Sequence, residues 1–188
     1  MNHYYPNDLI KKLHEREAQT SITSSALRNQ GPSGTIKIVR TYLTQNIDLS
    51  EFFSALVSPI IFQEYLDEKT ISLKATLPRR GELSMWGAAR KSLNLFFRSL
   101  VYNKIIFDHY SSDQDPLTYD RLIAPLEIPL DSHSAAGLKE LYPELTKWTG
   151  IVNLTPEISH KYQGKAQELA AQTGYARIHL DMEFWRQI

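Results

Sequence analysis

Two short segments of this chain each place a charged side chain near the expected start of a helix. Residues 85–94 (MWGAARKSLN) open a long apolar stretch and contain Lys91. Residues 126–133 (LEIPLDSH) lead into another expected helix and contain Asp131. A lysine amine that has lost its proton is a nucleophile able to form a Schiff base, and a carboxylate can take up that proton or stabilise a developing cation. We therefore treat Lys91 and Asp131 as candidate catalytic residues.

Lys91 follows three small residues, Gly87, Ala88 and Ala89, in the opening turns of its helix. Small residues let another backbone approach closely, and the free amides of a helix start bind phosphate oxygens. The positive end of the helix dipole and the neighbouring Arg90 both disfavour a protonated amine, which predicts a lowered pKa for Lys91. The alternative is an ordinary surface lysine on an amphipathic helix.

Asp131 follows apolar residues at positions 126, 128 and 130 and precedes Ser132. A partly buried carboxylate at a helix start can stabilise a developing cation, activate water or deprotonate an ammonium. Alternatively, Asp131 or Ser132 only caps the helix, since short polar side chains accept hydrogen bonds from its free amides. His133 can contact a phosphate or a base, or form a hydrogen bond within the local turn.

The charges cancel over the whole chain, with 21 basic and 21 acidic side chains, so no global field attracts nucleic acid. One segment is nevertheless basic, because residues 74–104 hold seven Lys or Arg and only one acid, Glu82. Such a segment fits a one-sided nucleic-acid footprint or a solvated helix face. Within it, Arg79 and Arg80 can hold phosphates or simply lie in a solvated loop.

Several classes of protein are excluded or disfavoured by composition. The absence of cysteine excludes disulfides, thiolate catalysis and cysteine-ligated metal centres. The six histidines show no HxxxH or HExxH spacing, and no glycine-rich phosphate loop is present, so we expect neither a metal nor a cofactor. The first residues are polar and no apolar run approaches about 18 residues. We expect a cytoplasmic protein with no membrane segment.

Helical periodicity dominates the chain and predicts an all-α fold. Residues 35–45 carry β-branched side chains, but their apolar positions repeat at helical spacing, so we favour a helix there. No convincing hairpin or repeat interrupts the pattern. Helices are expected over residues 7–18, 35–45, 49–56, 59–66, 86–107, 133–141, 156–172 and 177–185.

Residues 85–93 (MWGAARKSL) resemble the hairpin and second helix of the helix-hairpin-helix DNA glycosylases, the superfamily of endonuclease III and the oxoguanine glycosylases. The pattern of that superfamily is roughly Leu-Pro-Gly-Val-Gly-x-Lys-Thr/Ser-Ala. Residues 130–133 (LDSH) resemble its Val-Asp-Thr-His segment. This chain departs from the pattern at Trp86 and Ala89, which replace the proline and the second glycine of the hairpin. The 40 positions between Lys91 and Asp131 also exceed the family's usual spacing.

The resemblance is specific only over residues 85–141, and it implies one two-lobed helical domain spanning residues 1–188. It implies a protein that binds duplex DNA, damaged DNA included, with base-excision glycosylase or abasic-site lyase activity. Lys91 corresponds to the Schiff-base nucleophile and Asp131 to the catalytic aspartate. The expected DNA contacts are Arg79, Arg80, Gly87, Ala88, Ala89, Arg90 and His133. Two alternatives stay open: a non-catalytic DNA- or protein-binding module on the same scaffold, and a helical scaffold with no nucleic-acid role.

Overall fold

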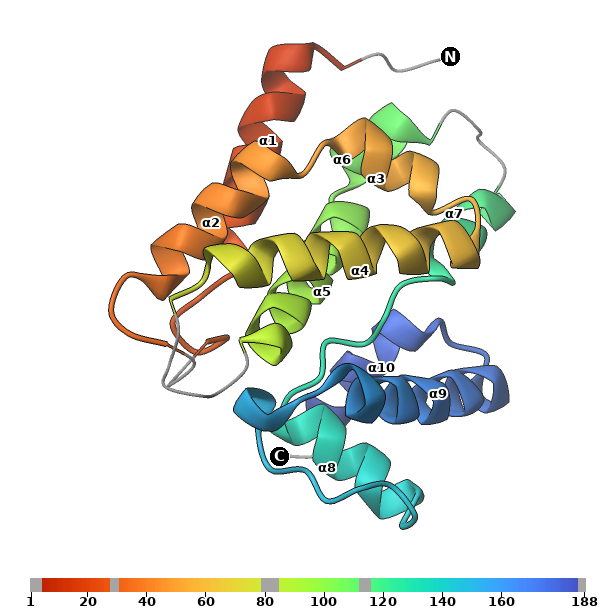
Figure 1. The fold of residues 1–188 in the computed structure, drawn as a ribbon. Coiled ribbons are helices and arrows are strands. Elements are labelled where there is room, and N and C mark those ends of the chain that lie inside the picture. Colours follow the sequence, from red (N-terminus) through yellow and green to blue (C-terminus); the bar gives the residue numbers. More distant parts are fainter. Residues whose placement is uncertain (1–4, 28–30, 79–84, 112–115, 186–188) are drawn as a thin grey trace.

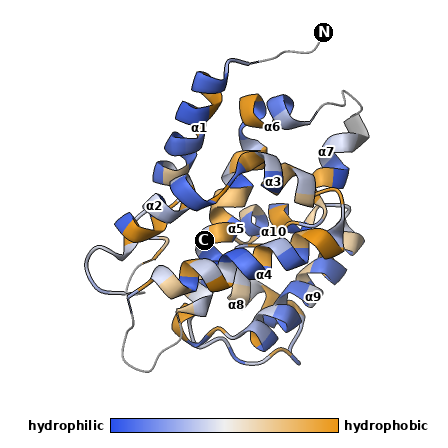
Figure 2. Ribbon diagram, turned by 45° about the horizontal axis from the view of Figure 1, so that its top comes forward, coloured by the Kyte–Doolittle hydropathy of each residue, from blue (hydrophilic) through white to orange (hydrophobic). Residues whose placement is uncertain are grey.

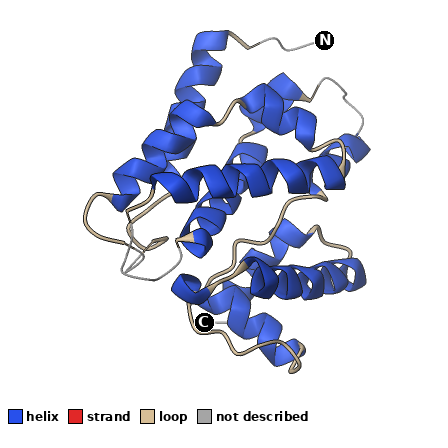
Figure 3. Cartoon of the chain, in the orientation of Figure 1, coloured by secondary structure: helices blue, strands red, loops and turns tan. Residues whose placement is uncertain are grey.

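The chain is all-helical in a computed structural model that describes residues 5–27, 31–78, 85–111 and 116–185 (Figures 1 and 3). None of the described residues lies in a strand, so the predicted all-α class is confirmed. The α-helices are α1 Asn7–Thr20, α2 Thr35–Asn46, α3 Leu49–Ala55, α4 Pro59–Thr76, α5 Trp86–Tyr102, α6 Lys104–Tyr110, α7 Pro116–Ile123, α8 Ser132–Leu141, α9 Pro156–Thr173 and α10 Leu180–Trp185; the short 3-10 helices are η1 Ile151–Asn153 and η2 Arg177–His179.

The segment with mixed propensity, residues 35–45, is the helix α2, as its apolar spacing predicts. Val39, Tyr42 and Leu43 are buried on one face, so burial outweighs the preference of β-branched residues for strands. Asp48 caps the next helix, because its carboxylate accepts hydrogen bonds from two free amides at the start of α3.

The predicted end of one helix is wrong, one predicted helix is two, and one helix was not predicted. Helix α4 continues ten residues beyond Leu66, through a mostly exposed stretch whose sparse apolar positions conceal its periodicity. The helix expected over residues 86–107 is two helices, since it ends at Tyr102 and the side chain of Asn103 caps a new one by accepting a hydrogen bond from the amide of Ile106. Helix α7 occupies a stretch for which no helix was expected.

The buried apolar side chains form two clusters, one in each group of helices. The larger cluster is built by α1 to α6 around the central α5, and the smaller one by α8, α9 and α10, which lie together below the others in Figure 1. Polar and apolar residues are interleaved along the helices (Figure 2), as expected where each helix buries one face. Trp148 packs against both clusters and so lies at their junction.

The start of α5 joins the two groups through a close contact at Gly87. A Cβ atom at this position would lie 2.2 Å from the carbonyl oxygen of Ile151 in η1 and 2.8 Å from the Cβ of Leu154. The small residues before Lys91 therefore admit another backbone, as predicted, and that backbone is the chain's own.

Replacing Gly87 with alanine should lower the free energy of unfolding by about 1–3 kcal/mol, since a methyl group there must displace backbone atoms. The matched control is Gly164→Ala in α9, where an added Cβ meets nothing within 4 Å. That change should raise stability by about 0.5–1 kcal/mol through helix propensity alone. Urea denaturation of both variants measures the difference. Equal effects would contradict the close contact.

Candidate active site

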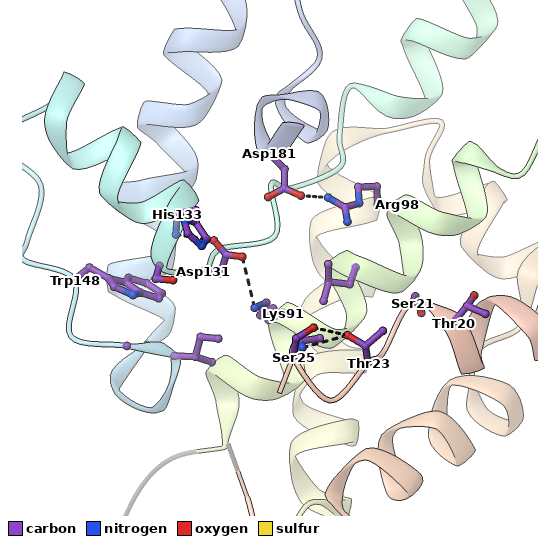
Figure 4. A pocket seen from close by; sticks show the side chains of 15 residues that line it. Thr20, Ser21, Thr23, Ser25, Lys91, Arg98, Asp131, His133, Trp148 and Asp181 are labelled. Atoms are coloured by element: carbon purple, nitrogen blue, oxygen red, sulfur yellow. Dashed lines mark hydrogen bonds and ion pairs between the residues drawn. The ribbon is translucent and has the colours of Figure 1, made fainter. Parts of the chain in front are cut away.

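Lys91 and Asp131 lie together in the wall of one cavity (Figure 4). The Nζ atom of Lys91 is 3.8 Å from Oδ2 of Asp131, and the two side chains are 7% and 14% exposed. The cavity of about 640 Å³ lies between α5, the N-terminus of α8 and residues 20–26, and both side chains line it. The structure therefore brings the two candidate catalytic residues together in one cavity.

The two oxygens of the Asp131 carboxylate have different partners. Oδ1 accepts hydrogen bonds from the amides of His133 and Ser134, at 2.9 and 3.1 Å, and the Ser134 hydroxyl accepts one from the Asp131 amide. This reciprocal capping box fixes the carboxylate at the start of α8. Oδ2 faces Lys91. Asp131 is therefore both a helix cap and the partner of the lysine.

The alternative of a surface lysine is wrong, because Lys91 is buried at the start of α5. Burial lowers the pKa of its amine, since a charged group loses hydration there. Asp131 opposes this shift, and the positive charge of Arg98 adds to it. The predicted direction agrees, but the neighbouring cation is Arg98 rather than Arg90.

A second ion pair lines the same cavity next to the first. Arg98, two helical turns after Lys91 on α5, donates a hydrogen bond from Nη1 to Oδ2 of Asp181 in α10 (Figure 4). Asp181 is only 5% exposed, although an acidic residue near the end of an amphipathic segment is usually found at the surface. The cavity thus holds two cations and two carboxylates from three helices.

Arg90 does not make the predicted phosphate contact. Its guanidinium is buried and donates to both carboxylate oxygens of Glu127, at 2.9 and 2.7 Å. A further nitrogen donates to Asp67 and to the hydroxyl of Thr70. Desolvation lowers the pKa of Arg90, but the charges and hydrogen bonds of Glu127 and Asp67 together outweigh it, so the pKa is raised and the arginine stays ionised inside the protein. Arg90 is a structural residue.

The other residues predicted to contact DNA lie in different settings. Gly87, Ala88 and Ala89 are buried, with η1 packed against Gly87, and a phosphate contact by their amides stays a prediction. His133 lines the cavity beside Asp131. Arg79 and Arg80 lie outside the described residues.

Several further residues complete the cavity and were not predicted from the sequence. Trp148 lines one side, and the C-terminus of α1 and the loop after it contribute Thr20, Ser21, Thr23 and Ser25. Arg98 could have been identified from the sequence, because a spacing of seven residues from Lys91 places it on the same helix face. The loop carried no such signal, since its approach depends on how α1 packs against α5.

Comparisons with protein-family models, with curated proteins and with solved structures found no match for this chain. Among the described residues, no three His, Asp or Glu side chains gather closely enough to hold a metal ion. None of the described helices has both the length and the apolar character required to cross a membrane.

The Arg90–Glu127 pair predicts a specific dependence of stability on pH. Burial tends to raise the pKa of Glu127, but the charge and hydrogen bonds of Arg90, with smaller contributions from Arg177 and Asn94, together hold the pKa below its ordinary 4.5. The ionised carboxylate therefore stabilises the fold above about pH 4.5, and this contribution is lost as the pH falls through the lowered pKa. Glu127→Gln should reduce the free energy of unfolding at pH 7 by about 3–5 kcal/mol, because it leaves a buried cation without its main partner.

Urea denaturation between pH 3 and pH 7 measures this effect, and the two proteins should converge in stability at the acid end. The control is Glu157→Gln, which removes an exposed carboxylate paired with Lys161 and should leave stability almost unchanged. A constant difference between Glu127→Gln and the unmodified protein across the pH range would contradict the assignment.

Proposed function

We propose that this chain is a DNA-binding protein that acts as a base-excision glycosylase or abasic-site lyase at the cavity. One observation carries the proposal: Lys91 and Asp131, 40 positions apart in sequence, are 3.8 Å apart in the wall of a single cavity. These are the two residues that the resemblance to helix-hairpin-helix glycosylases assigns to chemistry. The absence of any matching family leaves the proposal resting on this geometry and on the resemblance.

In the proposed reaction Lys91 attacks C1′ of a nucleotide. Asp131 first accepts a proton from the ammonium, which frees the nitrogen lone pair. As the glycosidic bond breaks, the base leaves with the bonding electrons and takes up the proton from Asp131, and the carboxylate so regenerated stabilises the positive charge that develops on the sugar. The lysine nitrogen forms the new bond to C1′ and gives its second proton to Asp131. When the bond between C1′ and the ring oxygen breaks, that oxygen takes up this proton and a protonated Schiff base remains. The lowered pKa of Lys91 makes the first proton transfer easier.

The dimensions of the cavity support a substrate of nucleotide size. A volume of about 640 Å³ falls within the range of about 300–1,000 Å³ that is typical of small-ligand sites. A duplex cannot enter such a space, so the target nucleotide must leave the base stack, as in other enzymes that act on bases. Trp148 and His133 supply flat side chains in the lining.

A second candidate is a non-catalytic DNA- or protein-binding module on the same scaffold. The observation that favours it is the burial of Arg90 and of residues 87–89. These residues were expected to contact phosphate, but they make contacts inside the protein instead. In this case the Lys91–Asp131 pair only joins α5 to α8. The two candidates differ in whether a covalent intermediate forms.

Borohydride trapping on abasic-site DNA tests the lyase directly. We expect a covalent complex with the unmodified protein and none with Lys91→Gln, because glutamine cannot form the Schiff base that borohydride reduces. The control is Lys161→Gln, which removes an exposed lysine of α9 and should leave trapping intact. Trapping that persists in Lys91→Gln would assign the nucleophile elsewhere.

Asp131→Asn separates catalysis from capping. Asparagine also caps helices, so the fold should be retained while base release or trapping slows by about 10²-fold or more. The control is Asp48→Asn, which changes the same kind of cap at the start of α3, away from the cavity. Asp131→Asn with full activity would contradict the proposed role. Binding of DNA without trapping or base release would favour the non-catalytic module.

A further inference from the structure

Arg98 lies between two cavities. It lines the cavity that holds Lys91, and it also lines a second cavity of about 660 Å³ between α1 and the C-terminal half of α5. Ser21, Leu95 and Asp181 line both as well. The Arg98–Asp181 pair therefore stands at the boundary of two adjoining spaces, and a chain-like ligand that occupies both must pass it.

Arg98 is bound much less completely than the other arginine of α5. Arg90 donates hydrogen bonds to three residues and is 4% exposed, whereas Arg98 is 24% exposed and, among the described residues, its hydrogen-bond partner is Asp181. A guanidinium carries five donors in a planar fork that matches a carboxylate or a phosphate. Arg98 thus keeps donors available beside the cavities.

The two cavities beside Arg98 are lined by equal numbers of basic and acidic side chains. The cavities are lined by three cations (Lys91, Arg98 and Arg16) and three carboxylates (Asp131, Asp181 and Glu17). Glu17 accepts a hydrogen bond from Asn103, and burial raises the pKa of Tyr102 to about 12, so this phenol stays neutral. Asp181 is consequently the group that a bound anion must replace at Arg98.

We propose that Arg98 is a phosphate-binding residue that exchanges Asp181 for a backbone phosphate of the nucleic-acid strand. This inference rests on the proposed function and identifies the contact that Arg90 does not provide. Seven residues along α5 separate Arg98 from Lys91 by about 10 Å. A strand with one nucleotide at Lys91 therefore brings a neighbouring phosphate towards Arg98 and continues into the second cavity.

The proposal predicts opposite effects of removing the two partners. Arg98→Gln should weaken binding of an oligonucleotide with a tetrahydrofuran abasic site by about tenfold or more, because a charge-assisted contact is lost. It should also reduce the slope of log K against log salt by about one. Asp181→Asn removes the competing carboxylate and should tighten binding. If the Arg98–Asp181 pair is purely structural, Asp181→Asn should not increase the affinity for the oligonucleotide.

Fluorescence anisotropy over a salt series provides the measurement, with thermal denaturation to confirm folding of each variant. The control Lys104→Gln also removes one cation but lines neither cavity, so it should change binding and slope much less. Arg98→Lys keeps the charge without the fork and should fall between the unmodified protein and Arg98→Gln.

The outcomes separate this inference from the function on which it rests. If the unmodified protein binds the oligonucleotide but Arg98→Gln binds with the same affinity and slope, the phosphate contact is overturned and the proposed function stands. The contact is also overturned if Asp181→Asn weakens binding as Arg98→Gln does. If the unmodified protein binds no oligonucleotide, both proposals fall.

Discussion

Arg90 and Glu127 face each other in the interior, where α5 meets the connecting segment, residues 124–131, that leads from α7 to α8. The carboxylate accepts two hydrogen bonds from the guanidinium and a third from Asn94, one turn further along α5. Glu127 is four residues before Asp131, and Arg90 is adjacent to Lys91. The distance between the two candidate catalytic residues therefore depends on this pair, and disrupting it leaves an uncompensated buried charge.

The connecting segment belongs to neither a helix nor a strand. Side chains from other elements therefore form many of the hydrogen bonds to its amide and carbonyl groups. Gln163 of α9 bonds both the amide and the carbonyl of Ile128, and Arg177 donates to the carbonyls of Pro125 and Leu126. These contacts fix the segment before the capping box of Asp131 begins α8. Adjacent residues of a helix point about 100° apart. Arg90 can thus anchor the segment while its neighbour faces the cavity, so that one turn of α5 combines a structural cation with a candidate nucleophile.

Helical periodicity was sufficient to predict the all-α class and the helix α2. The residue types in the two chemical segments were sufficient to single out Lys91 and Asp131, which the structure brings together. The sequence did not reveal that Arg90 is held inside the fold, because its partners, Glu127 and Asp67, come from distant segments. The burial of Asp181 could not be predicted either, since it depends on where α10 packs and on the contact with Arg98. The local pattern of side chains identifies candidates for chemistry, whereas the tertiary contacts decide which of them retain free donors and which are used to hold the fold together.

Lys91 carries a buried amine with a lowered pKa, held beside Asp131. NMR titration of protein labelled at the lysine side chains measures this directly and requires no substrate. We predict one resonance, absent in Lys91→Gln, that titrates below the lysines of the surface, and a further decrease of its pKa in Asp131→Asn, because the carboxylate opposes the effect of burial. A Lys91 resonance that titrates together with the surface lysines, and is insensitive to Asp131→Asn, would contradict the account.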